Sequence, residues 1–107
     1  DHALRHFATI LAGIIRRNDS AGRMGGEEFA VVLSDADRES AITFAQRLQQ
    51  QLDESPLVLD GERIPLTISI GVAAMSADDT SVEAVLSRSD MALYRAKQNG
   101  RNRIEAL

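Results

Sequence analysis

Two adjacent glycines followed by two glutamates, Gly25-Gly26-Glu27-Glu28, are the residues whose types and order point most directly to chemistry. Glycines adopt positive φ without a steric penalty, so the pair suits a tight turn and leaves the backbone open to a ligand. Carboxylates at such a tip can hold Mg²⁺, which proteins bind through one or two carboxylates together with substrate phosphates. Because side chains alternate along a strand, Glu27 and Glu28 are expected on opposite sides, which favours one metal ligand over two.

An acidic hairpin tip also has an ordinary explanation, since Gly-Gly turns with charged ends are common and keep a surface soluble. The four residues alone favour that interpretation.

A second feature is a cluster of cations near the end of the chain, formed by Arg95, Lys97, Arg101 and Arg103. Such a cluster can hold phosphate, or it can simply offset the negative end of a helix dipole in solvent. The local residues leave both explanations open.

Three helices are expected to position these groups. An apolar stripe predicts the first helix over residues 1–17, with Arg16 and Arg17 in its last turn. The second begins after Asp37, which supplies a capping oxygen, and ends before Pro56. The third is predicted to start at a capping box formed by Thr80 and Glu83 and to end at a glycine, residue 100.

Strands are expected between the helices. Residues 20–24 and 29–33 flank the two glycines and predict a hairpin, and residues 57–59 and 63–65 flank a second turn at Asp60-Gly61. Alternation over residues 66–73 predicts a central strand, in which Gly71 marks a bulge or a close backbone approach. A last strand is expected over residues 102–107.

Composition bounds the class of protein. A chain of 107 residues with 44% hydrophobic and 26% charged residues is expected to form one globular domain without a membrane span. Its net charge of −4 argues against general nucleic-acid binding, and the absence of cysteine fits a cytoplasmic location, although a parent protein anchored in a membrane is compatible with it. We therefore expect no nucleic-acid partner and no membrane contact from this segment.

Three motifs together resemble the GGDEF domains of the bacterial diguanylate cyclase family: residues 23–29 with the two glycines, residues 66–73 ending in Ser-Ile-Gly-Val-Ala, and residues 89–103. Glu27 stands where many members of the family carry Asp. The resemblance implies an α/β (α+β) fold that is palm-like and ferredoxin-like, with an antiparallel sheet flanked by helices. Residues 1–107 would then be the C-terminal part of a single GGDEF domain, and the family's first strand and helix would precede them.

The same resemblance implies an activity and its residues. A GGDEF homodimer is a nucleotidyltransferase that condenses two GTP molecules into the signalling molecule cyclic di-GMP and releases two pyrophosphates. Gly25 and Gly26 would let the hairpin backbone lie against the nucleotide, and Glu27 would ligate Mg²⁺ (or Mn²⁺). Both Glu27 and Glu28 remain candidates for taking the proton of the attacking 3′-hydroxyl.

Further residues match the family's nucleotide contacts. Lys97 and Arg101 match the positions that hold the terminal phosphates, and Asp1 matches a position that accepts hydrogen bonds from guanine. Arg16 and Asp19 form the family's Arg-x-x-Asp pattern, with Asp19 six residues before Gly25, and imply an allosteric product-inhibition site for cyclic di-GMP.

Arg47 matches a secondary contact to that inhibitor from a partner subunit. From the residues alone, Arg16 and Asp19 would instead be an ordinary surface ion pair.

The family's first strand and helix carry a second metal-binding aspartate and a guanine-binding asparagine. We therefore expect these 107 residues alone to be inactive and the parent domain to be active. The alternative is a GGDEF-like domain that no longer catalyses and serves as a cyclic di-GMP receptor or a regulatory dimerisation module.

Overall fold

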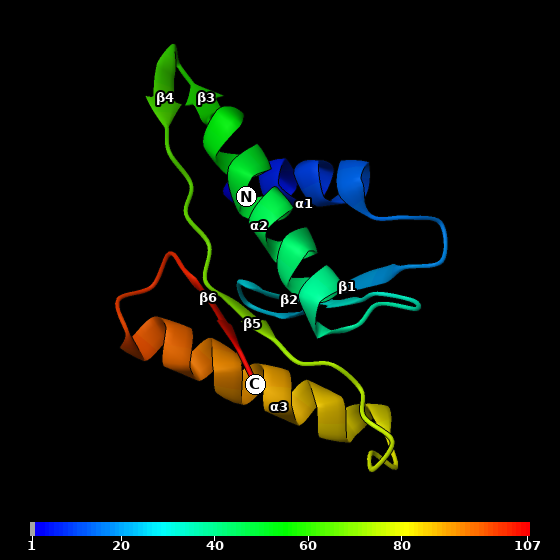
Figure 1. Ribbon diagram of the computed structural model, residues 1–107. Helices are drawn as coiled ribbons and strands as arrows, with labels where there is room; N and C mark the ends of the chain where they lie inside the picture. Colours follow the sequence, from blue (N-terminus) through cyan, green and yellow to red (C-terminus); the bar gives the residue numbers. More distant parts are fainter. Residues whose placement is uncertain (1) are drawn as a thin grey trace.

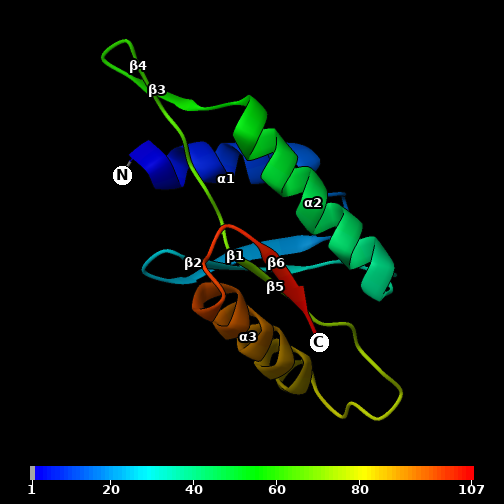
Figure 2. The same cartoon turned by 60° about the vertical axis from the view of Figure 1, so that its left-hand side comes forward.

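The computed structural model describes residues 2–107, which form three helices and six short strands (Figure 1). The helices are α1 (His2–Ile14), α2 (Arg38–Glu54) and α3 (Val82–Gln98). The strands are β1 (Ser20–Gly25), β2 (Glu28–Val32), β3 (Leu57–Leu59), β4 (Glu62–Ile64), β5 (Ile70–Val72) and β6 (Ile104–Ala106). In two views, α1 and α2 lie on one side of β1, β2, β5 and β6, and α3 lies on the other (Figure 2).

The strands form three separate two-stranded sheets. The pairs β1–β2 and β3–β4 are antiparallel hairpins, as predicted, whereas β5 and β6 run parallel. The mixed helix and strand architecture is thus confirmed, but in residues 2–107 it contains no single continuous sheet. The strand expected over residues 66–73 is paired only at Ile70–Val72, because three-residue β6 is its one partner in that part of the chain.

Two predicted helix ends are wrong. The first helix ends at Ile14, so Arg16 and Arg17 follow it, because an Asp19 carboxylate oxygen accepts from the Arg16 backbone N–H at 2.8 Å and turns the chain. The third helix is capped by Ser81, whose hydroxyl accepts from the Ala84 N–H at 3.3 Å, and not by Thr80. The predicted Asp37 cap of α2 is confirmed, since its carboxylate accepts from the Ser40 N–H at 2.8 Å.

Helix α3 packs directly on strand β5 at a glycine. A Cβ built on Gly71 would lie 2.1 Å from the Ser89 carbonyl oxygen and 2.3 Å from the Leu93 nitrogen, closer than atoms can approach. The close backbone approach predicted for Gly71 is therefore confirmed. Ala92 and Ala96, fully buried on the same helix, keep this contact short because their side chains are small.

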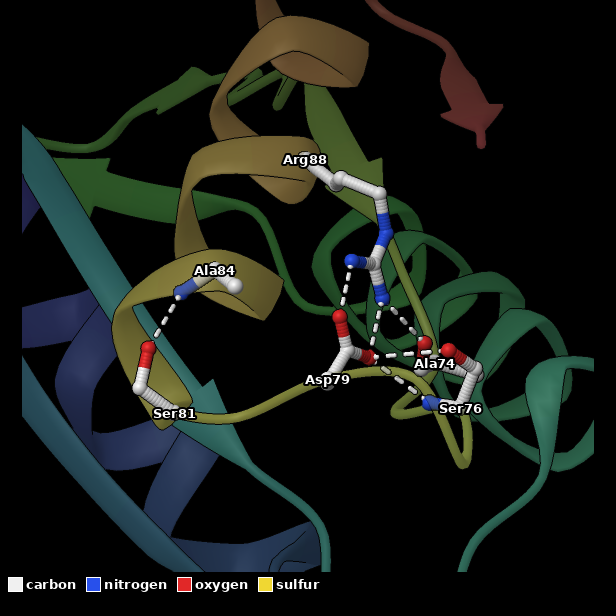
Figure 3. Close-up of polar contacts among 6 residues, drawn as sticks. All are labelled: Ala74, Ser76, Asp79, Ser81, Ala84 and Arg88. Atoms are coloured by element: carbon white, nitrogen blue, oxygen red, sulfur yellow. Dashed lines mark hydrogen bonds and ion pairs between the residues drawn. The ribbon is translucent and has the colours of Figure 1, made fainter.

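A paired arginine and aspartate fasten the segment between β5 and α3 (Figure 3). Arg88 donates through both terminal nitrogens to Asp79, at 2.5 and 2.8 Å, and also to the Ala74 carbonyl at 2.7 Å. Asp79 additionally accepts from the Ser76 N–H at 2.7 Å, and its side chain is only 6% exposed. The Arg88 guanidinium, followed by the Ser76 N–H, lowers the pKa of the Asp79 carboxyl well below its usual range.

This pair predicts an acid-sensitive contribution to stability. Because the folded-state pKa of Asp79 is depressed, the contribution is present above the unfolded pKa of about 4 and is lost as the pH falls further. We expect Asp79→Asn to lower the urea midpoint at pH 7 and to make the loss of stability below pH ~4 less steep. Urea denaturation at pH 7, 4 and 3 measures both effects. Asp78→Asn, at the exposed neighbouring position, is the control, and equal effects of the two variants would contradict the prediction.

Candidate active site

The glycine-glutamate hairpin closes through a tight turn at Gly26 and Glu27. Gly25 pairs with Glu28, and the register shifts between Arg23 and Gly25, so the turn is preceded by a bulge at Met24. Gly25 has φ 145° and Gly26 has φ 51°, which side chains rarely adopt, while the space around both is open. The turn therefore needs glycine for its backbone angles. Glu27 lies in the turn itself, one position earlier than the start of the returning strand.

An arginine that sequence reasoning did not single out holds this turn. Arg23 donates from Nε at 2.9 Å and from Nη2 at 2.6 Å to the same acceptor, the carbonyl oxygen of Gly26. Charged donors make hydrogen bonds that are shorter and stronger than neutral ones. An arginine two residues before paired glycines is the only sequence signal for this contact, and it is a weak one.

Helix α1 supports the base of the hairpin. Phe29, the residue after the two glutamates, packs against Phe7 with ring centroids 4.9 Å apart at an angle of 56°. Such a tilted arrangement is favourable for aromatic pairs. The strand leading into the turn is exposed along its whole length, so this contact lies on the returning strand alone.

The basic end of α3 reaches the hairpin. Lys97 Nζ lies 3.9 Å from a carboxylate oxygen of Glu28. Both side chains are partly exposed, Lys97 at 37% and Glu28 at 53%. Two groups that are far apart in the sequence, the acidic turn and the predicted phosphate ligand, are thereby brought together. Because the pair is solvated and long, it contributes little stability, and Lys97 stays accessible to an anion.

Arg101 lies just beyond the end of α3. Gly100 has φ 117°, as expected for a glycine that ends a helix, and Arg101 follows with φ 63°, its N–H bonded to the Ala96 carbonyl at 2.9 Å. Its side chain is exposed and has no ion pair within residues 2–107. The structure thus brings Lys97 to the hairpin and leaves Arg101 near the same helix end.

The predicted inhibitory residues lie at a different place, between α1 and α2. One Asp19 oxygen accepts from the Ser34 N–H at 3.0 Å and the other from the Arg16 N–H at 2.8 Å. These bonds, with Ser34 the larger cause, lower the pKa of the Asp19 carboxyl and keep it ionised. The contact between Arg16 and Asp19 runs through the Arg16 backbone, so no ion pair of their side chains forms in the described chain.

The Arg16 side chain therefore remains available. It lines an open surface hollow together with residues near the start of α2: Asp37, Glu39, Ser40 and Thr43. Arg47 is exposed one helical turn after Thr43. Arg16 thus borders the start of α2, and Arg47 lies on the same helix about one turn beyond this hollow.

Two features predicted from the sequence are a guanine-binding Asp1 and a metal site at the hairpin. Asp1, expected to accept from guanine, lies outside the described residues. Within residues 2–107, no group of three histidine or acidic side chains gathers in the manner of a protein-only metal site. Any metal at the hairpin would therefore take few ligands from the described residues.

The helices of this part of the chain are also too short or too polar to cross a membrane.

Comparison with known proteins places this arrangement in a class. The family model for the diguanylate cyclase GGDEF domain matches residues 1–103. Diguanylate cyclase A of Treponema denticola is 40% identical over 104 residues, which cover 97% of this chain and 28% of that protein.

Solved structures agree. The active GGEEF domain of a diguanylate cyclase from Vibrio cholerae has a TM-score of 0.83 and 36% identity, covering 96% of this chain and 65% of that one. The GGDEF domain of DgcB from Caulobacter crescentus, in complex with c-di-GMP, has a TM-score of 0.83 and 27% identity, covering 96% and 61%.

The α+β fold, with its hairpin beside the basic end of α3, is that of a palm-like domain. The chain belongs to the GGDEF domain family of diguanylate cyclases. It spans about a quarter of the length of the Treponema relative.

Proposed function

We propose that this chain is the catalytic hairpin portion of a diguanylate cyclase, which condenses two GTP molecules into cyclic di-GMP. The observation that carries the proposal is the approach of Lys97 to within 3.9 Å of Glu28. A cation beside an acidic glycine turn is suited to a nucleotide whose phosphates need neutralising while its hydroxyl is deprotonated. The named diguanylate cyclases among the relatives support the same reaction.

Each residue has a distinct task in this proposal. The bare backbone of Gly25 and Gly26 lies against the nucleotide, and Lys97 and Arg101 hold its terminal phosphates. The 3′-hydroxyl oxygen of one GTP attacks the α-phosphorus of the other, its proton passes to Glu27 or Glu28, and the bond to pyrophosphate breaks. Two such steps close the ring, so two domains in a homodimer each present one GTP.

A divalent cation fits the hairpin as a partner of the substrate. Glu27 in the exposed turn offers one carboxylate, and Mg²⁺ or Mn²⁺ commonly takes one or two carboxylates, with phosphates and water completing its shell. When bound, such a cation polarises a phosphoryl oxygen and lowers the pKa of a coordinated hydroxyl. Asp1, at the matching position, would accept from guanine.

The sheet edges support an assignment of residues 1–107 to the C-terminal part of a single GGDEF domain. Within residues 2–107, β5 pairs only with β6, and β1 and β2 pair only with each other. Unpaired backbone groups in the middle layer of a domain are costly, so a further strand between these pairs would complete it. By this proposal the 107 residues alone are inactive, and the complete domain works in the cytoplasm, where GTP is available.

A direct assay tests the proposed reaction. The full-length protein is incubated with GTP and Mg²⁺, and the products are separated and identified by mass. One cyclic di-GMP and two pyrophosphates per two GTP are expected, with no cyclic product from ATP. A protein that binds cyclic di-GMP but leaves GTP unchanged would instead be the receptor that forms the alternative function.

The surface between α1 and α2 supports product inhibition. Asp19 is held ionised by two backbone N–H groups, so it is a preorganised acceptor for the N1–H and N2–H donors of guanine. Arg16 is free to stack on a base and to donate to phosphate, and Arg47 of a partner subunit would add a third contact. We assign cyclic di-GMP to this site as the inhibitor.

Arg16→Ala is expected to weaken cyclic di-GMP binding at this surface by about tenfold or more, because a hydrogen bond to a charged group is worth ~1.5–3 kcal/mol. The measurement is calorimetry together with the inhibitor concentration that halves GTP turnover. Arg17→Ala changes the exposed neighbour and should leave both values unaltered. Equal weakening by the two variants would show that only net charge matters here.

A further inference from the structure

Arg23 lies inside the signature hairpin and has no part in the chemistry described above. Its guanidinium folds over the turn and donates two hydrogen bonds to the Gly26 carbonyl, at 2.9 Å from Nε and 2.6 Å from Nη2. A fork of this kind, with two donors on one acceptor, is available to arginine because its N–H groups are coplanar and rigidly spaced. The acceptor is the carbonyl of the peptide that joins Gly26 to Glu27.

That peptide otherwise has little to hold it. Strand β1 is exposed throughout, Met24 at the bulge is 65% exposed, and nothing lies within 4 Å of a Cβ placed on Gly25 or Gly26. Two successive glycines also have more backbone freedom than any other pair of residues. Packing therefore does not select one orientation of the turn. Besides the flanking strand pair Gly25–Glu28, the two hydrogen bonds from Arg23 are the described interactions that can.

Holding this carbonyl sets the direction of the residue that follows. The described chain contains no cis peptide bond, so the Glu27 N–H points opposite to the Gly26 carbonyl. Because the Gly26 carbonyl is turned toward Arg23, the Glu27 N–H faces away from the Arg23 side chain. The orientation of this peptide also fixes the position of the Glu27 Cα, from which the Glu27 side chain extends. Catalytic groups must be held close to their productive geometry, and small displacements cost rate.

We propose that Arg23 is a positioning residue: it locks the Gly26–Glu27 peptide and thereby aims the Glu27 carboxylate. The proposal rests on the proposed function for its catalytic consequence, but its structural part stands on the two hydrogen bonds alone. It predicts that the substrate still binds when Arg23 is removed, because Lys97 and the other phosphate contacts lie on different elements. The loss of activity is therefore expected in kcat, which reports the chemical step, and not in KM.

The test compares Arg23→Ala, Arg23→Lys and the control Arg63→Ala in the full-length protein. Arg63 is the exposed arginine of the second hairpin, whose turn at Asp60 and Gly61 has the same positive-φ character. The first measurement is backbone hydrogen exchange over residues 23–29. Arg23→Ala is expected to raise exchange there by about fivefold, the equivalent of one lost hydrogen bond of ordinary strength, while Arg63→Ala changes nothing.

The second measurement is steady-state turnover of GTP. Arg23→Ala is expected to lower kcat by about 100-fold while KM changes by less than about twofold, and Arg23→Lys should recover part of kcat because one charged donor still reaches the carbonyl. Unchanged exchange in Arg23→Ala would overturn the proposal, even with kcat lost, because Arg23 would then act on the substrate. A wild-type protein that does not convert GTP would overturn the proposed function, and the exchange result would still decide the role of Arg23 in the turn.

Discussion

Replacing Glu27 by glutamine is expected to lower kcat for cyclic di-GMP formation by about 100-fold or more. The reason is that this carboxylate is either the metal ligand or the proton acceptor in the turn, whereas a neutral amide binds Mg²⁺ more weakly and cannot take the proton. The substitution keeps the size and the backbone of the residue, so the fold should be unaffected. The measurement is the initial rate of the full-length protein at saturating GTP and Mg²⁺.

The second hairpin of the molecule supplies the control. Glu62 also follows a glycine directly, Gly61, and is exposed, but it is the first residue of β4 in the β3–β4 hairpin, which projects beyond the end of α2 (Figure 1). Glu62→Gln should therefore retain full activity. A Glu27→Gln variant with wild-type kcat would mean that the hairpin is only a surface turn, as the residues by themselves had favoured.

Replacing Gly71 by alanine is expected to destabilise the protein by about 3 kcal/mol, at the upper end of the usual cost of overpacking. The added Cβ meets the backbone of Ser89 and Leu93 at 2.1 and 2.3 Å, and backbone atoms cannot move aside without shifting the whole of α3. Because Lys97 reaches Glu28 from the end of this helix, KM for GTP should rise as well. Urea denaturation and steady-state kinetics measure the two effects.

Gly13→Ala is the matched control with the opposite sign. Gly13 lies in α1 with nothing within 4 Å of an added Cβ, so alanine should be tolerated there and should stabilise the helix by up to ~1 kcal/mol. Loss of stability in Gly71→Ala no larger than a few tenths of a kcal/mol would show that α3 can slide on β5. The direct contact between them would then not position the basic end of the helix.

Local features were predictable because neighbouring residues create them. The hairpin at Asp60-Gly61 follows from two residues that accept positive φ, and both do so in the structure, at 52° and 80°. The buried face of α2 follows from apolar residues three and four positions apart, since Ala45, Leu48 and Leu52 have this spacing and all are buried. Gly71 was identified because a glycine within a strand needs a reason, and the approach of α3 is that reason.

The two wrongly predicted helix ends lie where a hydrogen bond to a polar side chain determines the boundary. Thr80 and Ser81 both suit a helix cap, and in the structure it is the Ser81 hydroxyl that accepts from the Ala84 N–H. The first helix stopped earlier than its apolar pattern, because the Asp19 carboxylate bonds the Arg16 N–H. In both cases a polar side chain accepts a hydrogen bond from a backbone N–H at the helix end, and the pattern of apolar residues does not predict this bond.

The sequence by itself determined the family, the turn chemistry and the residue types of the site, because these depend on short motifs whose backbone demands are local. Only the tertiary structure decided which of those residues meet. Lys97 approaches Glu28 from the end of α3, which packs on β5 at Gly71, and Arg23 bonds the Gly26 carbonyl across the bulge at Met24. Distances between groups far apart in the chain are set by how whole elements pack, which no local pattern specifies.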